Sequence, residues 1–142
     1  MKIGFLTDKN GYRAPIHPES IEKYSLDVHL EKDIFDYLNY SESSQNNVKS
    51  VSKVSDLDIV ACVENIEDKK IKDLKEGAVL IGIFDFEKIE EIKNLRPDIK
   101  ILSFFKLPRI SRAQNLDALS SQANLLGYAS VLRAAKETSD VV

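Results

Sequence analysis

The residues best suited to chemistry gather in one short stretch, between positions 108 and 124 of the 142-residue chain. Arg109 and Arg112 lie there within a few residues of Gln114, Asp117 and Ser120. These side chains offer cationic donors, a carboxylate acceptor, and amide and hydroxyl groups that both donate and accept. The stretch follows an apolar strand-like segment and precedes a long helical pattern, which is where α/β proteins place a ligand.

A plainer interpretation treats the same residues as the start of a helix. Ser111 and Gln114 have the spacing of a capping box, and Asp117 would sit near a helix N-terminus. That interpretation leaves Arg109 and Arg112 without a role, because cations are unfavourable beside a helix N-terminus. We therefore expect a binding loop that also caps the helix.

The elements that must position this loop alternate along the chain. Apolar runs of strand type cover residues 2–6, 26–30, 57–63, 78–84 and 99–105. Helical patterns cover residues 18–24, 33–40, 66–74, 86–95 and a long segment from 116, whereas 41–55 reads as a polar surface connection. The alternation predicts a three-layer α/β fold of the flavodoxin-like or Rossmann-like kind. Its open, mostly parallel sheet would have about five strands, with helices on both faces and a long helix at the end.

Ligands of such sheets bind beyond the carboxyl ends of the strands. Segments 7–17 and 106–117 both leave strands at that edge, so Arg13 joins the candidate binding residues. The long helix carries two adjacent apolar rows, more than one core-facing stripe requires. Their members are Leu116, Leu119, Ala123 and Leu126 in one row and Ala118, Leu125, Ala129 and Leu132 in the other. We expect another domain or a second copy of the chain to cover this helix.

Composition excludes several classes of protein. The net charge is −3 with no basic patch, which argues against nucleic-acid binding. The single cysteine, Cys62, lies in an apolar run and predicts a reduced, buried thiol. No run is long enough to span a bilayer and the first residues do not resemble a signal peptide, so we expect a cytoplasmic or other reducing location. The sequence has no metal-ligand cluster and, with five glycines, no nucleotide-binding turn of its own.

Residues 108–128, Pro-Arg-Ile-Ser-Arg-Ala-Gln-Asn-Leu-Asp-Ala-Leu-Ser-Ser-Gln-Ala-Asn-Leu-Leu-Gly-Tyr, resemble the signature of the alpha subunit of proton-translocating NAD(P) transhydrogenases. Residues 12–19, Tyr-Arg-Ala-Pro-Ile-His-Pro-Glu, are similar to a loop shared by transhydrogenases and alanine dehydrogenases. The resemblance implies hydride transfer between NADH and NADP, coupled to proton translocation through a membrane component. Residues 1–142 would form a single domain, the first half of an NAD(H)-binding unit whose Gly-rich half is absent from this chain.

The resemblance also implies a role for each loop residue. Arg109, Asp117 and Ser120 would hold the nicotinamide carboxamide and nearby ribose of NAD(H), and Gln114 would reach toward NADP(H) on a partner domain. Arg13 is a further cofactor-binding candidate, with a structural role equally open. The implied partners are the dinucleotide-binding half, the NADP(H)-binding domain and a second copy in a homodimer. They would hold the chain at the periphery of a membrane in the cytoplasm or a matrix-like compartment, and the isolated chain would be inactive.

Two alternatives stand beside this interpretation. One is an alanine dehydrogenase-like N-terminal domain. It is disfavoured because Cys62 stands where that family has a lysine, and Ile83-Phe84-Asp85 stands where it has a histidine. The other is a free-standing, non-catalytic module that binds partners or dimerises through its last helix.

Overall fold

The computed structural model describes the chain apart from residues 9–12, 25–26, 38–47, 52, 109 and 140–142. The chain divides into two compact units, residues 1–103 and 104–142. The first unit holds the sheet, and the second holds the polar loop and the long helix. Each unit is described by itself below.

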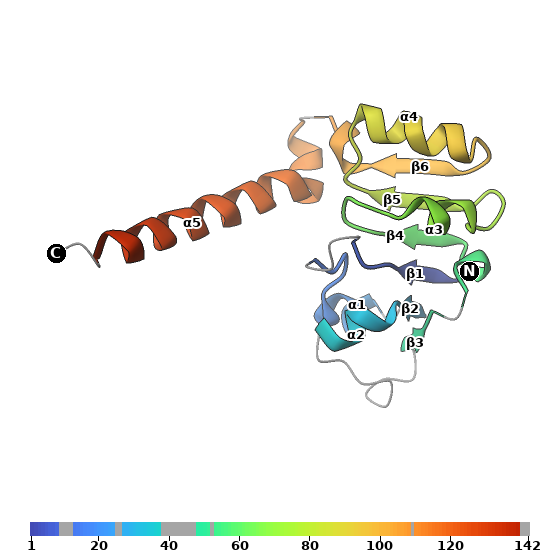
Figure 1. Cartoon of the computed structure of the whole chain (residues 1–142), viewed down its shortest axis with the longest axis horizontal. Coiled ribbons are helices and arrows are strands. Elements are labelled where there is room, and N and C mark those ends of the chain that lie inside the picture. The colour runs from blue at the N-terminus through green and yellow to red at the C-terminus, as the bar shows by residue number, and fades with distance from the viewer. Residues whose placement is uncertain (9–12, 25–26, 38–47, 52, 109, 140–142) are drawn as a thin grey trace. The chain divides into compact units, whose positions relative to one another are not determined.

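The first unit is built on a sheet in which every described strand pairing is parallel. Its described strands are β1 (Ile3–Phe5), β2 (Val28–Leu30), β3 (Val48–Ser50), β4 (Ile59–Ala61), β5 (Val79–Gly82) and β6 (Lys100–Ser103). They lie in the order β3-β2-β1-β4-β5-β6, so the chain starts near the centre and winds outward in both directions (Figure 1). This is the order of a doubly wound sheet, with the switch point between β1 and β4. The predicted α/β fold is confirmed.

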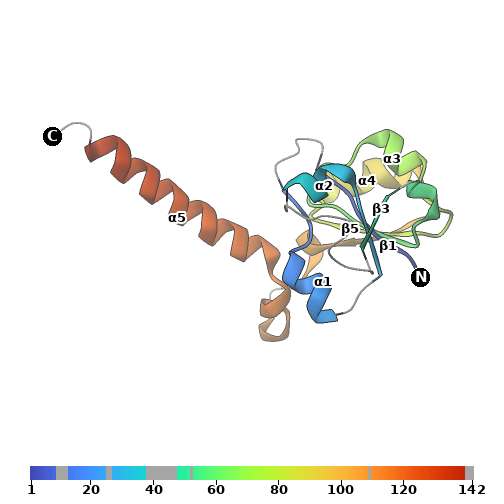
Figure 2. The same ribbon diagram turned by 90° about the horizontal axis from the view of Figure 1, so that it is seen from below.

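The helices of this unit are α1 (Pro18–Tyr24), α2 (Lys32–Tyr37), α3 (Asp68–Lys72) and α4 (Phe86–Leu95). Figure 2 shows α1 on one face of the sheet and α3 and α4 on the other. α4 illustrates why its sequence is helical. The Asp85 carboxylate caps it by accepting a hydrogen bond from the backbone N–H of Lys88 at 2.8 Å. Ile89 and Ile92, three residues apart, are then buried against the sheet.

Two apolar clusters form the core, one on each face of the sheet. Side chains alternate between the faces along a strand, so the neighbours Phe5 and Leu6 belong to different clusters. The larger cluster joins Leu6, Leu57, Val60, Leu80 and Phe84 to Ile71 of α3 and to Ile89 and Ile92 of α4. The smaller one joins Phe5, Val28, Leu30 and Val48 to Ile21 of α1 and to Ile34 and Phe35 of α2.

The sheet has one more described strand than the sequence predicts, and the polar connection expected at 41–55 is in part wrong. β3 forms at Val48–Ser50, and Val54–Asp56 forms a 3-10 turn. β3 is an edge strand, so it needs little apolar sequence. Val48 alone is buried there, while Lys49 and Ser50 are exposed. The rest of that connection, residues 41–47 and 52, lies outside the described residues.

The last strand ends earlier than the apolar run 99–105 predicts. β6 stops at Ser103, and Phe104–Lys106 form a 3-10 turn in the second unit. The Ser103 hydroxyl accepts from the backbone N–H of Phe84 at 3.0 Å and donates to its carbonyl at 2.6 Å. A side chain thereby takes the place of the next rung of the ladder.

The second unit continues with a 3-10 helix at Ser111–Leu116 and ends in the 22-residue helix α5 (Ala118–Ser139). The predicted long terminal helix is confirmed. Its large apolar side chains are mostly exposed, with Leu125 and Leu126 each 70% and Tyr128 68% accessible. Nevertheless, no helix among the described residues combines the length and hydropathy that a membrane crossing requires.

Candidate functional site

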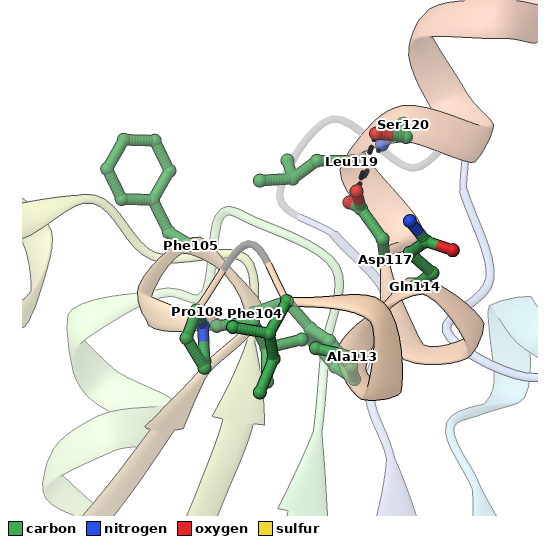
Figure 3. A pocket seen from close by; sticks show the side chains of 10 residues that line it. Phe104, Phe105, Pro108, Ala113, Gln114, Asp117, Leu119 and Ser120 are labelled. Atoms are coloured by element: carbon green, nitrogen blue, oxygen red, sulfur yellow. Dashed lines mark hydrogen bonds between the residues drawn. The ribbon is translucent and has the colours of Figure 1, made fainter.

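The polar loop closes around a pocket of about 400 Å³ that lies entirely within the second unit. Three of the residues singled out in the sequence, Gln114, Asp117 and Ser120, line it together (Figure 3). They meet because the 3-10 helix at 111–116 turns the chain back toward the first turn of α5. The structure therefore gathers these three predicted site residues around one cavity.

The remaining wall of the pocket is apolar. Phe104, Phe105 and Pro108 contribute from the segment before the 3-10 helix, and Leu119 contributes from α5. Phe105 is 45% exposed, so part of this wall faces solvent at the rim. An apolar wall with a few polar groups on one side is the common composition of small-molecule sites. It suits a flat ring that carries one polar substituent.

Asp117 and Ser120 form the best-defined polar contact of the pocket. One carboxylate oxygen of Asp117 accepts from the backbone N–H of Ser120 at 3.0 Å, and the other accepts from its hydroxyl at 2.6 Å (Figure 3). Asp117 thus caps α5, as the helix-start interpretation predicts. The capping box predicted at Ser111 and Gln114 is wrong, because Ile110 precedes that turn and makes no side-chain cap.

Arg109, the predicted carboxamide donor, lies outside the described residues, so its binding role stays a prediction. Arg13 is described and belongs to the first unit. One of its terminal nitrogens, Nη2, donates to Asp8 at 2.9 Å and also to Glu64. The hydrogen bond to Glu64 outweighs desolvation and, with Asp8, raises the pKa of the Arg13 guanidinium. Arg13 therefore has a structural function, whatever it contributes to a ligand.

Sequence reasoning missed the partners of Arg13. Asp8 follows β1, and its carboxylate also accepts from the backbone N–H of Asn65 at 2.6 Å, in the segment after β4. Its side chain is only 3% exposed, and that of Arg13 is 39% exposed. The three residues lie at the carboxyl edge of the sheet, beside the switch point. A polar residue at the end of a predicted strand was the available signal, and Thr7-Asp8 has it.

A second ionic contact lies at the same edge. Glu31 follows β2, accepts from both the backbone N–H and the hydroxyl of Thr7, and binds the ammonium group of Lys70 at 2.6 Å. Burial opposes ionisation of Glu31, but the hydrogen bonds from Lys70 and Thr7 outweigh it and hold the pKa of the carboxyl below its ordinary value. These contacts tie β1 and β2 to α3. Sequence reasoning gave neither Glu31 nor Lys70 a role.

The buried thiol expected at Cys62 is confirmed. Burial, and then the negative charge of Asp8, raise the pKa of Cys62 to about 12. The side chain is therefore neutral at physiological pH and cannot serve as a nucleophile or as a cation. A neutral group at this position cannot replace the lysine of alanine dehydrogenases.

Comparison with known proteins follows the same line. The chain is 34% identical over 139 residues to the NAD(P) transhydrogenase subunit alpha of Haemophilus influenzae, covering 91% of this chain and 27% of the relative. It is 34% identical over 151 residues to the first of the proteins that make up subunit alpha in Rickettsia prowazekii, covering 94% and 39%. The crystal structure of transhydrogenase from Sinorhizobium meliloti superposes with a TM-score of 0.78 at 27% identity. That match covers 96% of this chain and 45% of the other.

No family model matches the sequence. The chain spans less than half the length of each relative named above. Both sequence and structure nevertheless align with transhydrogenases over about nine tenths of the chain. The similarity to NAD(P) transhydrogenase alpha subunits that residues 108–128 predict is thereby confirmed, and the chain is a relative of those subunits.

Proposed function

We propose that this chain is part of an NAD(P) transhydrogenase and that its second unit positions the nicotinamide end of NAD(H). One observation carries the proposal. Gln114, Asp117 and Ser120 line a single pocket, and they come from the stretch that resembles the transhydrogenase signature. The relatives' names supply the oxidoreductase class, and the pocket supplies a place for the ring.

The residues present fit a nicotinamide ring. Phe104, Pro108 and Leu119 provide apolar contact for the ring faces. A carboxamide has one acceptor and two donors, which match an acceptor such as Asp117 and a donor such as Arg109. The pocket volume of about 400 Å³ lies within the usual range for ligand sites. The chain would thus fix the rotation of the ring about its bond to the ribose.

Bound NAD(H) would supply the hydride, and the chain itself needs no acid, base or nucleophile. Hydride transfer requires two rings held at near-attack distance, so positioning is most of the catalysis. Asp117 and Ser120 would hold one ring from the start of α5. Gln114 would reach from the preceding turn toward NADP(H) on the partner domain, and the apolar wall would limit the access of water.

The other components of the reaction would come from elsewhere. A Gly-rich half would complete the NAD(H) site with residues 1–142 as its first half, a second domain would hold NADP(H), and a membrane component would couple transfer to proton movement. The chain would then lie at the periphery of a membrane, on its cytoplasmic or matrix side. The exposed apolar side chains of α5 support contact with such a half or with a second copy in a homodimer. The isolated chain would be inactive.

The test is the substitution Gln114→Asn in the assembled transhydrogenase that contains this chain. The shorter side chain keeps the amide but withdraws it by one methylene, so we expect hydride transfer to fall roughly 10- to 100-fold. The affinity for NADH should change little, because the Gln114 amide would face the other nucleotide. The matched control is Gln122→Asn, the same change at a residue of α5 that does not line the pocket. A transfer rate equal to that of the unmodified enzyme would refute the role of Gln114.

A further inference from the structure

The Ser120 hydroxyl has a fixed direction. A hydroxyl has one hydrogen to donate and two lone pairs that accept. Ser120 donates that hydrogen to the Asp117 carboxylate at 2.6 Å, a short contact of the charge-assisted kind. The backbone N–H of Ser120 binds the other carboxylate oxygen at 3.0 Å, which holds both residues in place. Toward the pocket, Ser120 is left with lone pairs.

Resting on the proposed function, we infer that Ser120 is a specificity residue that accepts a hydrogen bond from the ring substituent of the ligand. The pocket therefore selects a pyridine ring that carries a carboxamide over one that carries a carboxylate. A carboxamide has N–H groups that can meet the Ser120 lone pairs, whereas a carboxylate would bring acceptor against acceptor. Gln114, which also lines the pocket, imposes no such choice because its amide both donates and accepts.

Asp117 acts in this scheme as a positioning residue for the hydroxyl. It caps α5 through the backbone of Ser120 and directs the side-chain hydrogen of the same residue away from a ligand. Asn also caps helices well, so Asp117→Asn should leave the start of α5 intact. The Asn amide would, however, donate to the Ser120 oxygen and turn the hydroxyl hydrogen toward the pocket. The preference for a carboxamide should then weaken or reverse.

The experiment is a titration of the 142-residue chain with three small pyridines, followed by amide chemical shifts of residues 104–121. Nicotinamide carries the donor, 3-acetylpyridine lacks it without adding charge, and nicotinate lacks it and is anionic. We expect nicotinamide to bind most tightly, roughly three- to tenfold better than 3-acetylpyridine, which is the usual range for one hydrogen bond. Nicotinate should bind most weakly of the three.

The variants identify the group responsible. Ser120→Ala should bring the ratio between nicotinamide and 3-acetylpyridine close to one. Ser121→Ala is the matched control, because the Ser121 hydroxyl bonds the backbone oxygen of Asp117 at 3.3 Å and does not line the pocket. That control should keep the ratio of the unmodified chain. Asp117→Asn should raise nicotinate affinity relative to nicotinamide, and adding Ser120→Ala to it should remove the gain.

The outcomes separate the two proposals. Nicotinamide shifts at the pocket with no preference over 3-acetylpyridine would overturn the inference about Ser120 and leave the proposed function standing. A preference that survives Ser120→Ala would also overturn it. No shift at residues 104–121 with any of the three compounds would overturn the ring pocket itself, and with it both proposals.

Discussion

Replacing Arg13 with alanine should destabilise the first unit, because it leaves a buried carboxylate without its cation. The Asp8 side chain is 3% exposed and bonds two groups that are described, the Arg13 guanidinium at 2.9 Å and the backbone N–H of Asn65 at 2.6 Å. Arg13 also binds Glu64, whose side chain is 49% exposed. The arginine thereby links the segments that follow β1 and β4, on either side of the switch point.

The magnitude follows from these exposures. Removing one partner of a fully buried ion pair costs about 3–5 kcal/mol. Here the Arg13 side chain is 39% exposed, so water replaces part of what Asp8 loses. The exposed contact with Glu64 contributes at most about 1 kcal/mol. We therefore expect Arg13→Ala to lower the free energy of unfolding by about 2 kcal/mol. With a typical urea dependence, the midpoint would fall by about 1 M.

The assay is urea unfolding followed by far-ultraviolet circular dichroism, since the chain has no tryptophan. Glu64→Gln serves as the matched control, because it removes only the exposed partner and should cost less than about 1 kcal/mol. Asp8→Asn combined with Arg13→Ala completes a double-mutant cycle, in which the pair should show coupling of at least about 1 kcal/mol. If Arg13→Ala costs no more than Glu64→Gln, the structural role is refuted and a ligand role for Arg13 gains support.

Two further predictions concern the rest of the described chain. Glu31→Gln should lower the free energy of unfolding at pH 7, because the hydrogen bonds from Lys70 and Thr7 hold the pKa of Glu31 below its ordinary 4.5 in the folded chain. That contribution is present above pH 4.5 and lost as the pH falls through the lowered folded-state pKa, so urea midpoints should differ at pH 7 and converge toward about pH 3; a constant gap would contradict this. Sedimentation equilibrium should show the chain dimerising with concentration through α5, where Leu126 is 70% exposed, and Leu126→Glu should abolish the dimer. A chain that stays monomeric throughout would exclude the homodimer.

Much of the fold follows from local sequence patterns. The apolar spacing of residues 86–95 predicts α4 with its bounds, and the continuous apolar runs around Val60 and Leu80 predict two central strands. Pro18 marks the first residue of α1, where its missing N–H has no intrahelical partner to lose. Burial imposes these patterns residue by residue, so they are legible without a structure. The gathering of polar residues at 108–124 likewise identified the loop that lines the pocket.

Other features depend on contacts between distant residues. β3 was missed because an edge strand needs only one buried side chain, Val48, and owes its place to pairing with β2. Arg13 meets Glu64 across 51 positions in the chain, and no local pattern predicts that partner. Such pairs form only when parallel strands bring their carboxyl ends to one edge.

The sequence by itself thus determined the elements, the α/β class and the candidate loop, because burial and helix capping act over a few residues. The tertiary structure decided which polar groups are committed to one another. It bound Arg13 to Asp8, and it turned the Ser120 hydroxyl toward Asp117. The direction of a hydrogen bond depends on atomic positions that residue types alone do not specify. For that reason the sequence can nominate a binding residue, whereas the fold determines whether that residue donates to a ligand or accepts from it.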